Sequence, residues 1–171
     1  MPDIDNVAWA AIIAGLVAVE RLGELAYAAR NTAQLLERGA VELGANQYPF
    51  IVALHSTWLI AILGFAPAAA GPVWPLLGIY AALQLVRFWV IASLGPYWTT
   101  RIITLPDAPL IKRGPYRFLR HPNYAVVIAE IAVLPLAFHE LGIALVFSAL
   151  NLAVLAWRIR VENGALAMRH G

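Results

Sequence analysis

The stretch that decides the fold is YPFIVALHSTWLIAILGFAPAAA, residues Tyr48–Ala70, which contains no Asp, Glu, Lys or Arg. A membrane-spanning helix needs about 20 predominantly apolar residues to cross a hydrocarbon core about 30 Å thick. This stretch is long enough to do so, and it brings no charged side chain into the lipid. It therefore predicts a transmembrane helix.

Four further apolar stretches extend this interpretation to the whole chain. They lie at Val7–Tyr27, Pro72–Leu94, Tyr124–Phe138 and Leu141–Trp157. The last two are short and are separated only by His139 and Glu140, which predicts a tight helical hairpin; it either spans the membrane, which we prefer, or is tilted and partly re-entrant. Of the 171 residues, 61% are hydrophobic and 13% charged, against about 25% charged in soluble domains. We expect one membrane domain over residues 1–171, an all-α bundle of about five transmembrane helices.

The basic residues indicate how these helices are oriented. Arg and Lys follow the first, third and fifth stretches, whereas the N-terminus, the turn at residues 66–73 and the turn at His139 and Glu140 contain none. Basic residues accumulate in the cytoplasmic connections of membrane proteins. We therefore predict five spans with the N-terminus outside and the C-terminus in the cytoplasm, and Arg87 as the one basic residue inside a span. The opening MPDIDNVAWA has no Lys or Arg, so the first stretch is expected to be a retained helix rather than a cleaved signal peptide.

Composition excludes several classes of function. The chain has no cysteine, which excludes disulfides, thiolate metal sites and cysteine nucleophiles. The net charge of +2 is too small to indicate a nucleic-acid partner. We assign no metal site, and we expect membrane lipids and a lipophilic small molecule as the partners.

The longest connection, Gly95–His121, contains Pro96, Pro106, Pro109 and Pro115. These prolines prevent a single continuous helix. The aromatic and apolar content of the segment argues against disorder. We therefore expect an ordered, irregular connector, and long connectors of this kind in compact proteins are often functional.

The densest group of polar side chains is KRGPYRFLRHPNY, residues 112–124, which joins this connector to the fourth stretch. Four cations, a histidine and two tyrosines meet where Pro122 marks the first turn of a helix. The free backbone N–H groups and the positive dipole end of such a helix attract a carboxylate or a phosphate. The competing interpretation is that these cations bind anionic lipid headgroups and fix the orientation of the chain.

Arg158 and Glu162 form a second group, four residues apart where the fifth helix is expected to leave the membrane. This spacing places both side chains on one helical face. In the functional interpretation, the arginine holds an oxyanion while the glutamate orients it or accepts a proton. The alternative is an interfacial salt bridge, which contributes little to stability when exposed.

Polar side chains inside the predicted spans are His55, Gln84, Arg87 and Glu130. Ionisable groups in hydrocarbon by default face a partner or a cavity. Arg87 and Glu130 are expected to pair across the third and fourth helices, either as a structural clamp or as a ligand contact. Glu20, Arg21 and Glu24 are interpreted as the polar end of the first helix, with no further role.

The segment GPYRFLRHPNY, followed by an apolar hairpin and then Arg158 and Glu162, resembles the isoprenylcysteine carboxyl methyltransferase family over roughly Ile111–Leu166. The resemblance implies a multispanning membrane enzyme that uses S-adenosylmethionine, with Arg158 and Glu162 as the catalytic residues. It implies that the cofactor site is lined by Gly114, Pro115, Tyr116, Arg120, His121, Pro122 and Tyr124, and we add Lys112 from the same group. One departure is Asn163, which stands where many members have a second glutamate.

Two further stretches, GAVELGANQYPFIVALH from Gly39 and YWTTRIITLPDAPLIKRGPYRFLRHPNY from Tyr97, resemble a narrower bacterial subgroup. This subgroup lies beside type III polyketide synthases and methylates alkylpyrones or alkylresorcinols. The resemblance implies a multi-pass protein of the bacterial inner membrane, with residues 95–171 as the cofactor-binding half. From the placement of the basic residues we expect the active site to face the cytoplasm.

We therefore expect transfer of a methyl group from S-adenosylmethionine to an oxygen of a lipophilic, membrane-embedded substrate. The acceptor is an alkylpyrone or phenolic lipid, or alternatively the carboxylate of a protein isoprenylcysteine. A membrane NADPH-dependent reductase is the rival enzyme class, although the chain has no Rossmann-type glycine fingerprint. A small transporter or scaffold is the non-enzymatic alternative, and it predicts a polar path across the membrane. The sequence leaves the oligomeric state open.

Overall fold

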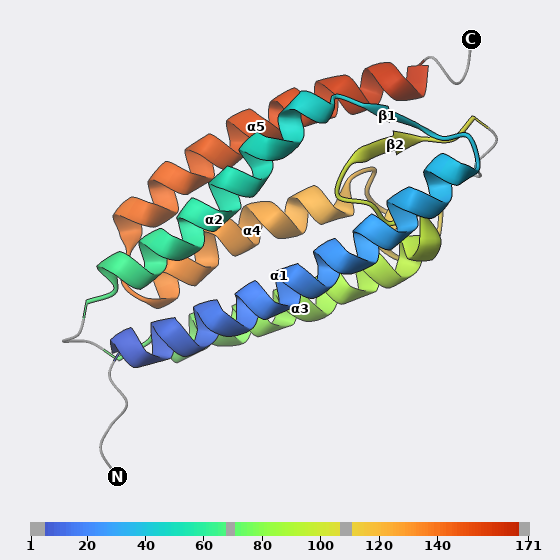
Figure 1. Cartoon of the computed structure of the whole chain (residues 1–171). Coiled ribbons are helices and arrows are strands. Elements are labelled where there is room, and N and C mark those ends of the chain that lie inside the picture. Colours follow the sequence, from blue (N-terminus) through green and yellow to red (C-terminus); the bar gives the residue numbers. More distant parts are fainter. Residues whose placement is uncertain (1–5, 68–70, 107–110, 168–171) are drawn as a thin grey trace.

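The computed structural model describes residues 6–67, 71–106 and 111–167, with side chains up to Gly164. Within these residues five α-helices form a bundle (Figure 1), which confirms the all-α fold prediction. The helices are α1 (Asn6–Glu37), α2 (Tyr48–Phe65), α3 (Trp74–Leu94), α4 (Pro122–Ala137) and α5 (Leu141–Ala167). Three single 3-10 turns, Ala45–Gln47 (η1), Gly95–Tyr97 (η2) and Gly114–Arg117 (η3), lie in the connections.

Successive helices run in opposite directions, so that their connections gather at the two ends of the bundle (Figure 1). The starts of α1 and α3, the end of α2 and the α4–α5 turn lie at one end (Figure 1), called here the turn end. Contacts between segments distant in sequence hold it together: the Val73 N–H donates to the Ala137 carbonyl (2.8 Å), and the His139 ring donates to the Gly71 carbonyl (2.9 Å). The long connector and the end of α5 lie at the other end, called here the basic end.

Four of these helices, α1, α2, α3 and α5, are long and apolar enough to cross a membrane. Helix α4 has 16 residues against 27 in α5. At 1.5 Å per residue α4 is therefore about 16 Å shorter than α5. The last residue of α4 lies beside the start of α3 at the turn end. Because α4 is short, its first residue does not reach the basic end. This recess accommodates the connector.

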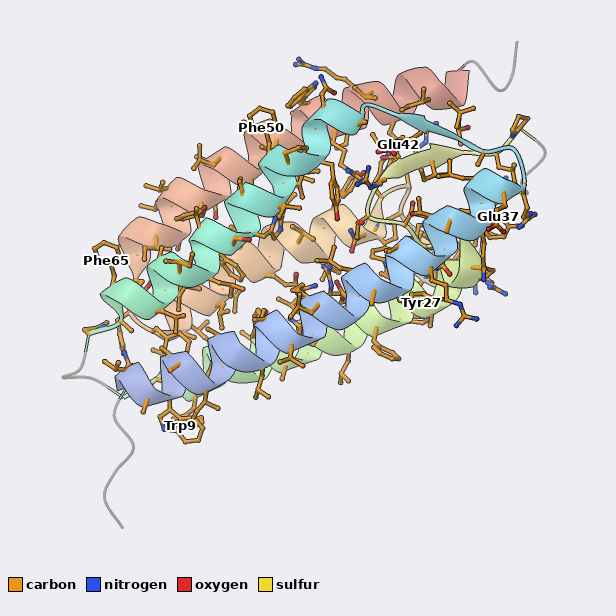
Figure 2. The ribbon with its side chains drawn as sticks, viewed as in Figure 1. Trp9, Tyr27, Glu37, Glu42, Phe50 and Phe65 are labelled. Carbon is orange, nitrogen blue, oxygen red and sulfur yellow. The ribbon has the colours of Figure 1, made fainter. Side chains whose placement is uncertain are left out.

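The outer surface is apolar, as a membrane requires. Phe65 (74% exposed), Leu85 (75%) and Phe88 (73%) are examples of large side chains left uncovered by the bundle. In Figure 2, Phe50 and Phe65 project outward from α2. Large exposed apolar patches are rare on soluble proteins but suit a surface that contacts lipid.

The interior contains a buried charge cluster, made of Arg21, Glu24, Gln84, Arg87 and Glu130. The predicted pair of Arg87 with Glu130 is confirmed (3.3 Å). The interpretation of Arg21 and Glu24 as a polar helix end without a further role is wrong, as is the expectation that Arg87 is the one basic residue inside. Helix α1 continues to Glu37, so these two residues lie mid-helix and pair with Glu130 (Arg21, 3.0 Å) and Arg87 (Glu24). His55 contacts the Ile51 carbonyl of its own helix instead.

A small antiparallel sheet at the basic end was not predicted. Strand β1 (Val41–Leu43) pairs with β2 (Ile102–Thr104), with Val41 opposite Thr104. An ion pair from Glu42 to Arg101 (2.8 Å) reinforces it. The sheet joins the α1–α2 connection to the predicted connector, whose described parts are ordered and irregular; Pro109 and the basic Arg169 of the tail lie outside the described residues.

Candidate active site

A pocket of about 230 Å³ lies at the basic end, above the first turn of α4. Three segments form its wall: the connector from Leu94 to Thr104, the stretch that leads into α4, and the last part of α5. Its lining residues include Trp98, Thr104, Tyr116, Arg120, His121, Pro122, Asn123, Tyr124, Arg158 and Glu162.

Helix α4 begins at the pocket, as the proline predicted. Pro122 is its first residue and His121 caps it, so Pro122 causes no loss of a backbone hydrogen bond. The rings of His121 and Tyr124 stack with centroids 5.1 Å apart and planes 12° apart. One face of the Tyr124 ring is therefore covered by a neighbour of its own segment.

Tyr124 bridges the two residues predicted to be catalytic. Arg158 Nε donates to the Tyr124 hydroxyl (2.8 Å), which in turn donates to Glu162 Oε2 (2.6 Å). Within the described residues no ion pair joins Arg158 directly to Glu162. The helical spacing therefore places both side chains beside Tyr124, and the hydroxyl separates the two charges.

Two further contacts hold Arg158 and Glu162 in position. Arg158 Nη2 donates to the Thr100 carbonyl (2.9 Å), which ties α5 to the connector. Nδ1 of His121 lies 3.6 Å from Glu162 Oε2.

Burial raises the pKa of the Tyr116 phenol, and the nearby Glu162 carboxylate raises it further, so this phenol stays neutral at physiological pH.

Three residues that line the pocket each have one buried polar atom without a hydrogen-bond partner among the described residues. These atoms are Trp98 Nε1, Thr104 Oγ1 and His121 Nε2. Leaving a buried donor or acceptor unpaired costs about 1–3 kcal/mol. A polar ligand in the pocket would offer partners for them, whereas the other buried atoms without a partner in the described chain, such as Tyr80 Oη and Asn151 Nδ2, belong to residues away from the pocket.

The family model described as "Isoprenylcysteine carboxyl methyltransferase (ICMT) family" matches residues 76–168, which include all of α4 and every residue that lines the pocket. The chain belongs to this family. The family resemblance of the sequence is thereby confirmed, whereas the narrower bacterial subgroup stays a prediction. Membership indicates a membrane methyltransferase.

Two similar proteins match nearly the full length of the chain. The "Uncharacterized protein YpbQ" of Bacillus subtilis (strain 168) is 36% identical over 161 residues, which are 91% of this chain and 95% of that protein. An "Uncharacterized protein" of Haemophilus influenzae (strain ATCC 51907 / DSM 11121 / KW20 / Rd) is 26% identical over 169 residues, 95% of this chain and 94% of that protein. No solved structure matches the chain.

The residues predicted for the ICMT cofactor site fall into two groups. Tyr116, Arg120, His121, Pro122 and Tyr124 line the pocket together with Arg158 and Glu162, whereas Lys112, Gly114 and Pro115 do not.

The second group has a different setting. Lys112 is exposed and Pro115 is buried. Gly114 has a φ of 55°, and a Cβ there would overlap the Ser93 hydroxyl. Since Arg113 Nε also donates to the Ser93 carbonyl (2.7 Å), this segment fastens η3 to the end of α3. It positions Tyr116 from behind the pocket wall.

Sequence reasoning missed the wall formed by the connector, above all Trp98 and Thr104. An aromatic residue and a threonine in an irregular loop form no spacing pattern that would mark them as residues of a site. Thr104 becomes part of the pocket through its pairing with Val41. The two stretches that carried the subgroup resemblance are therefore in contact.

Proposed function

We propose that this ICMT-family protein is an S-adenosylmethionine-dependent methyltransferase that methylates an oxygen of a lipophilic substrate. The observation that supports it most is the group of Arg158, Tyr124 and Glu162 in one pocket with the start of α4. An alkylpyrone or phenolic lipid is the proposed acceptor, and an isoprenylcysteine carboxylate is the alternative.

The chemistry of the pocket fits S-adenosylmethionine, which combines a carboxylate, a cationic sulfonium and a flat adenine. Arg120, His121 and the positive dipole end of α4 suit the carboxylate. The expected free N–H groups are largely used within the helix, because those of Tyr124 and Ala125 donate to the His121 carbonyl. Tyr116 offers a neutral aromatic ring, and Trp98 an unpaired donor. When bound, this cofactor supplies an electrophilic methyl group.

Arg158 and the residues that hold it would then orient the acceptor. Arg158 is held at Nε by Tyr124 and at Nη2 by Thr100, so its remaining N–H groups form a preorganised donor for an oxyanion. Catalysis would come chiefly from aligning the acceptor oxygen and excluding water. A carboxylate needs no general base, whereas a hydroxyl must first lose its proton, for which Glu162 is the nearest acceptor.

The pocket lies at the basic end, and this position is the basis for the orientation that we propose in the membrane. We place this end in the cytoplasm of a bacterium, where S-adenosylmethionine is made, and the protein in the inner membrane. Because the native chain has no cysteine, single cysteines at exposed Gly71 and exposed Arg117 can be labelled cleanly. An impermeant reagent added outside should label Gly71→Cys and not Arg117→Cys; the reverse pattern would overturn this orientation.

Methyl transfer tests the proposal directly. Purified protein in lipid nanodiscs is given radiolabelled S-adenosylmethionine with a long-chain 4-hydroxy-2-pyrone or with a prenylated cysteine derivative. We expect label on the oxygen of one of them. Glu162→Gln should reduce turnover most on a phenolic lipid, whose neutral hydroxyl must lose a proton, and less on these two acidic acceptors. No transfer to either acceptor by a protein that binds the cofactor would contradict the proposed substrate class.

A further inference from the structure

Trp98 is a pocket residue whose burial needs an explanation. It is 4% exposed and packs with Ala28 of α1 and Val90 of α3. An indole nitrogen can donate a hydrogen bond but cannot accept one. That N–H has no acceptor among the described residues. The folded chain thus keeps a costly unpaired donor in a residue that lines the pocket.

The position of Trp98 is fixed by its backbone. Asn31 of α1, itself 3% exposed, donates from Nδ2 to the carbonyls of Gly95 (3.1 Å) and Trp98 (2.9 Å). These bonds hold η2 and the residue after it against α1. The backbone of Trp98 is therefore held in place, and a ligand in the pocket would supply the missing acceptor.

The surroundings of Trp98 indicate which part of a ligand it meets. Ile91, Leu94 and Tyr116 pack against the same buried cluster, so its neighbours are apolar or aromatic. Arg101 of the connector lines the pocket but is paired with Glu42 (2.8 Å). The other cations of the pocket come from the segment before α4 and from α5. A carboxylate is best stabilised beside those cations, whereas a flat uncharged heterocycle suits an aromatic corner with one neutral donor.

We propose that Trp98 donates its indole N–H to a ring nitrogen of adenine, and that Trp98 and Tyr116 form the adenine end of the pocket. The assignment rests on the proposed function, because it takes the ligand to be S-adenosylmethionine. Tyr124 is less suited to stacking on the base, since His121 covers one of its faces. The carboxylate end then lies at Arg120 and His121.

Two ligands separate the ends of the pocket. S-adenosylhomocysteine carries both adenine and a carboxylate, while 5′-methylthioadenosine carries adenine without the amino-acid part. Equilibrium binding of each to the full chain in detergent is compared for the parent, Trp98→Phe and His121→Ala. Trp98→Phe should weaken both ligands by a similar factor, about three- to tenfold. His121→Ala should weaken S-adenosylhomocysteine and leave 5′-methylthioadenosine unchanged.

Trp58 provides the matched control. It is 2% exposed like Trp98, but its N–H donates to the Ile131 carbonyl in the core (3.2 Å). Trp58→Phe should lower the unfolding midpoint without changing either affinity. If Trp98→Phe does not fold, Tyr116→Leu tests the same corner, because loss of a stacking ring should weaken both ligands at least fivefold.

The outcomes are distinct. If folded Trp98→Phe binds both ligands as tightly as the parent does, the assignment is overturned and the proposed function stays intact. The same holds for Tyr116→Leu where that is the variant that folds. A loss confined to S-adenosylhomocysteine would place Trp98 at the carboxylate end and overturn it as well. NADPH also carries adenine and is titrated in parallel. A parent that binds NADPH but neither of the other ligands would overturn the proposed function, and weakening of that binding by Trp98→Phe would still support the adenine contact.

Discussion

Two polar networks lie at different depths of the bundle, and they differ in how completely their hydrogen bonds are made. In the buried charge cluster, Arg87 contacts both Glu24 and Glu130, and Arg21 contacts the same two carboxylates. In the pocket, Arg158 and Glu162 share one tyrosine hydroxyl, and three buried atoms on the wall have no partner in the described chain.

The difference shows how charges in one membrane protein serve two purposes. Two arginines and two glutamates that satisfy one another can stay inside a bundle without a ligand, and they join α1, α3 and α4. A network with unpaired donors is costly unless a ligand arrives. Removing a residue from the first network should therefore affect stability, and from the second, binding or turnover.

Arg87→Met should give the largest effect on stability. The substitution leaves two buried carboxylates short of a cation, and breaking a buried pair in this way costs about 3–5 kcal/mol. Unfolding in detergent measures the loss. Arg101→Met is the control, because its pair with Glu42 is partly exposed (side chains 39% and 22%) and should contribute less than about 1 kcal/mol. Equal losses in both variants would remove the contrast between buried and surface pairs.

Arg158→Lys should give the largest effect on turnover. Lysine keeps the charge but cannot hold Tyr124 and Thr100 with a planar fork. We expect kcat to fall about 10²–10³-fold, as when a preorganised charge-stabilising donor is lost, with little change in S-adenosylhomocysteine affinity. Arg160→Lys, at an exposed position of the same helix, should leave kcat unchanged. Parental turnover of Arg158→Lys would mean that Arg158 has only an interfacial role.

Tyr124→Phe should give a smaller loss. The ring stays stacked on His121 while the bridge between Arg158 and Glu162 disappears. Hydrogen bonds to charged groups are worth about 1.5–3 kcal/mol, so kcat should fall about tenfold or somewhat more. Cofactor affinity should be retained. A variant that loses affinity instead of turnover would show that the hydroxyl belongs to the cofactor site.

The sequence was sufficient for features that depend on local pattern. Five apolar stretches predicted the five helices, Pro122 predicted the start of α4, and a four-residue spacing placed Arg158 and Glu162 on one face. It was insufficient where the contact depends on packing between distant segments. Arg87 meets Glu24 across 63 residues of sequence, and no periodic pattern marks that partner.

The same limit applies to the connector. Arg158 donates to a backbone carbonyl at Thr100, 58 residues away, and backbone acceptors leave no trace in side-chain composition. In the sequence, nothing distinguishes Trp98 from other interfacial aromatic residues. Its unpaired N–H is evident only in the folded structure. The short β1–β2 pairing has too few residues to show an alternating pattern.

The most direct test of the account is equilibrium binding of S-adenosylmethionine and NADPH to the purified parent protein. The account predicts saturable binding of S-adenosylmethionine, weakened in folded His121→Ala and retained in Arg87→Lys, whose charge stays inside the bundle. It predicts no competition by NADPH. Binding of NADPH alone, or binding of S-adenosylmethionine that is insensitive to His121→Ala, would contradict the assignment of the pocket.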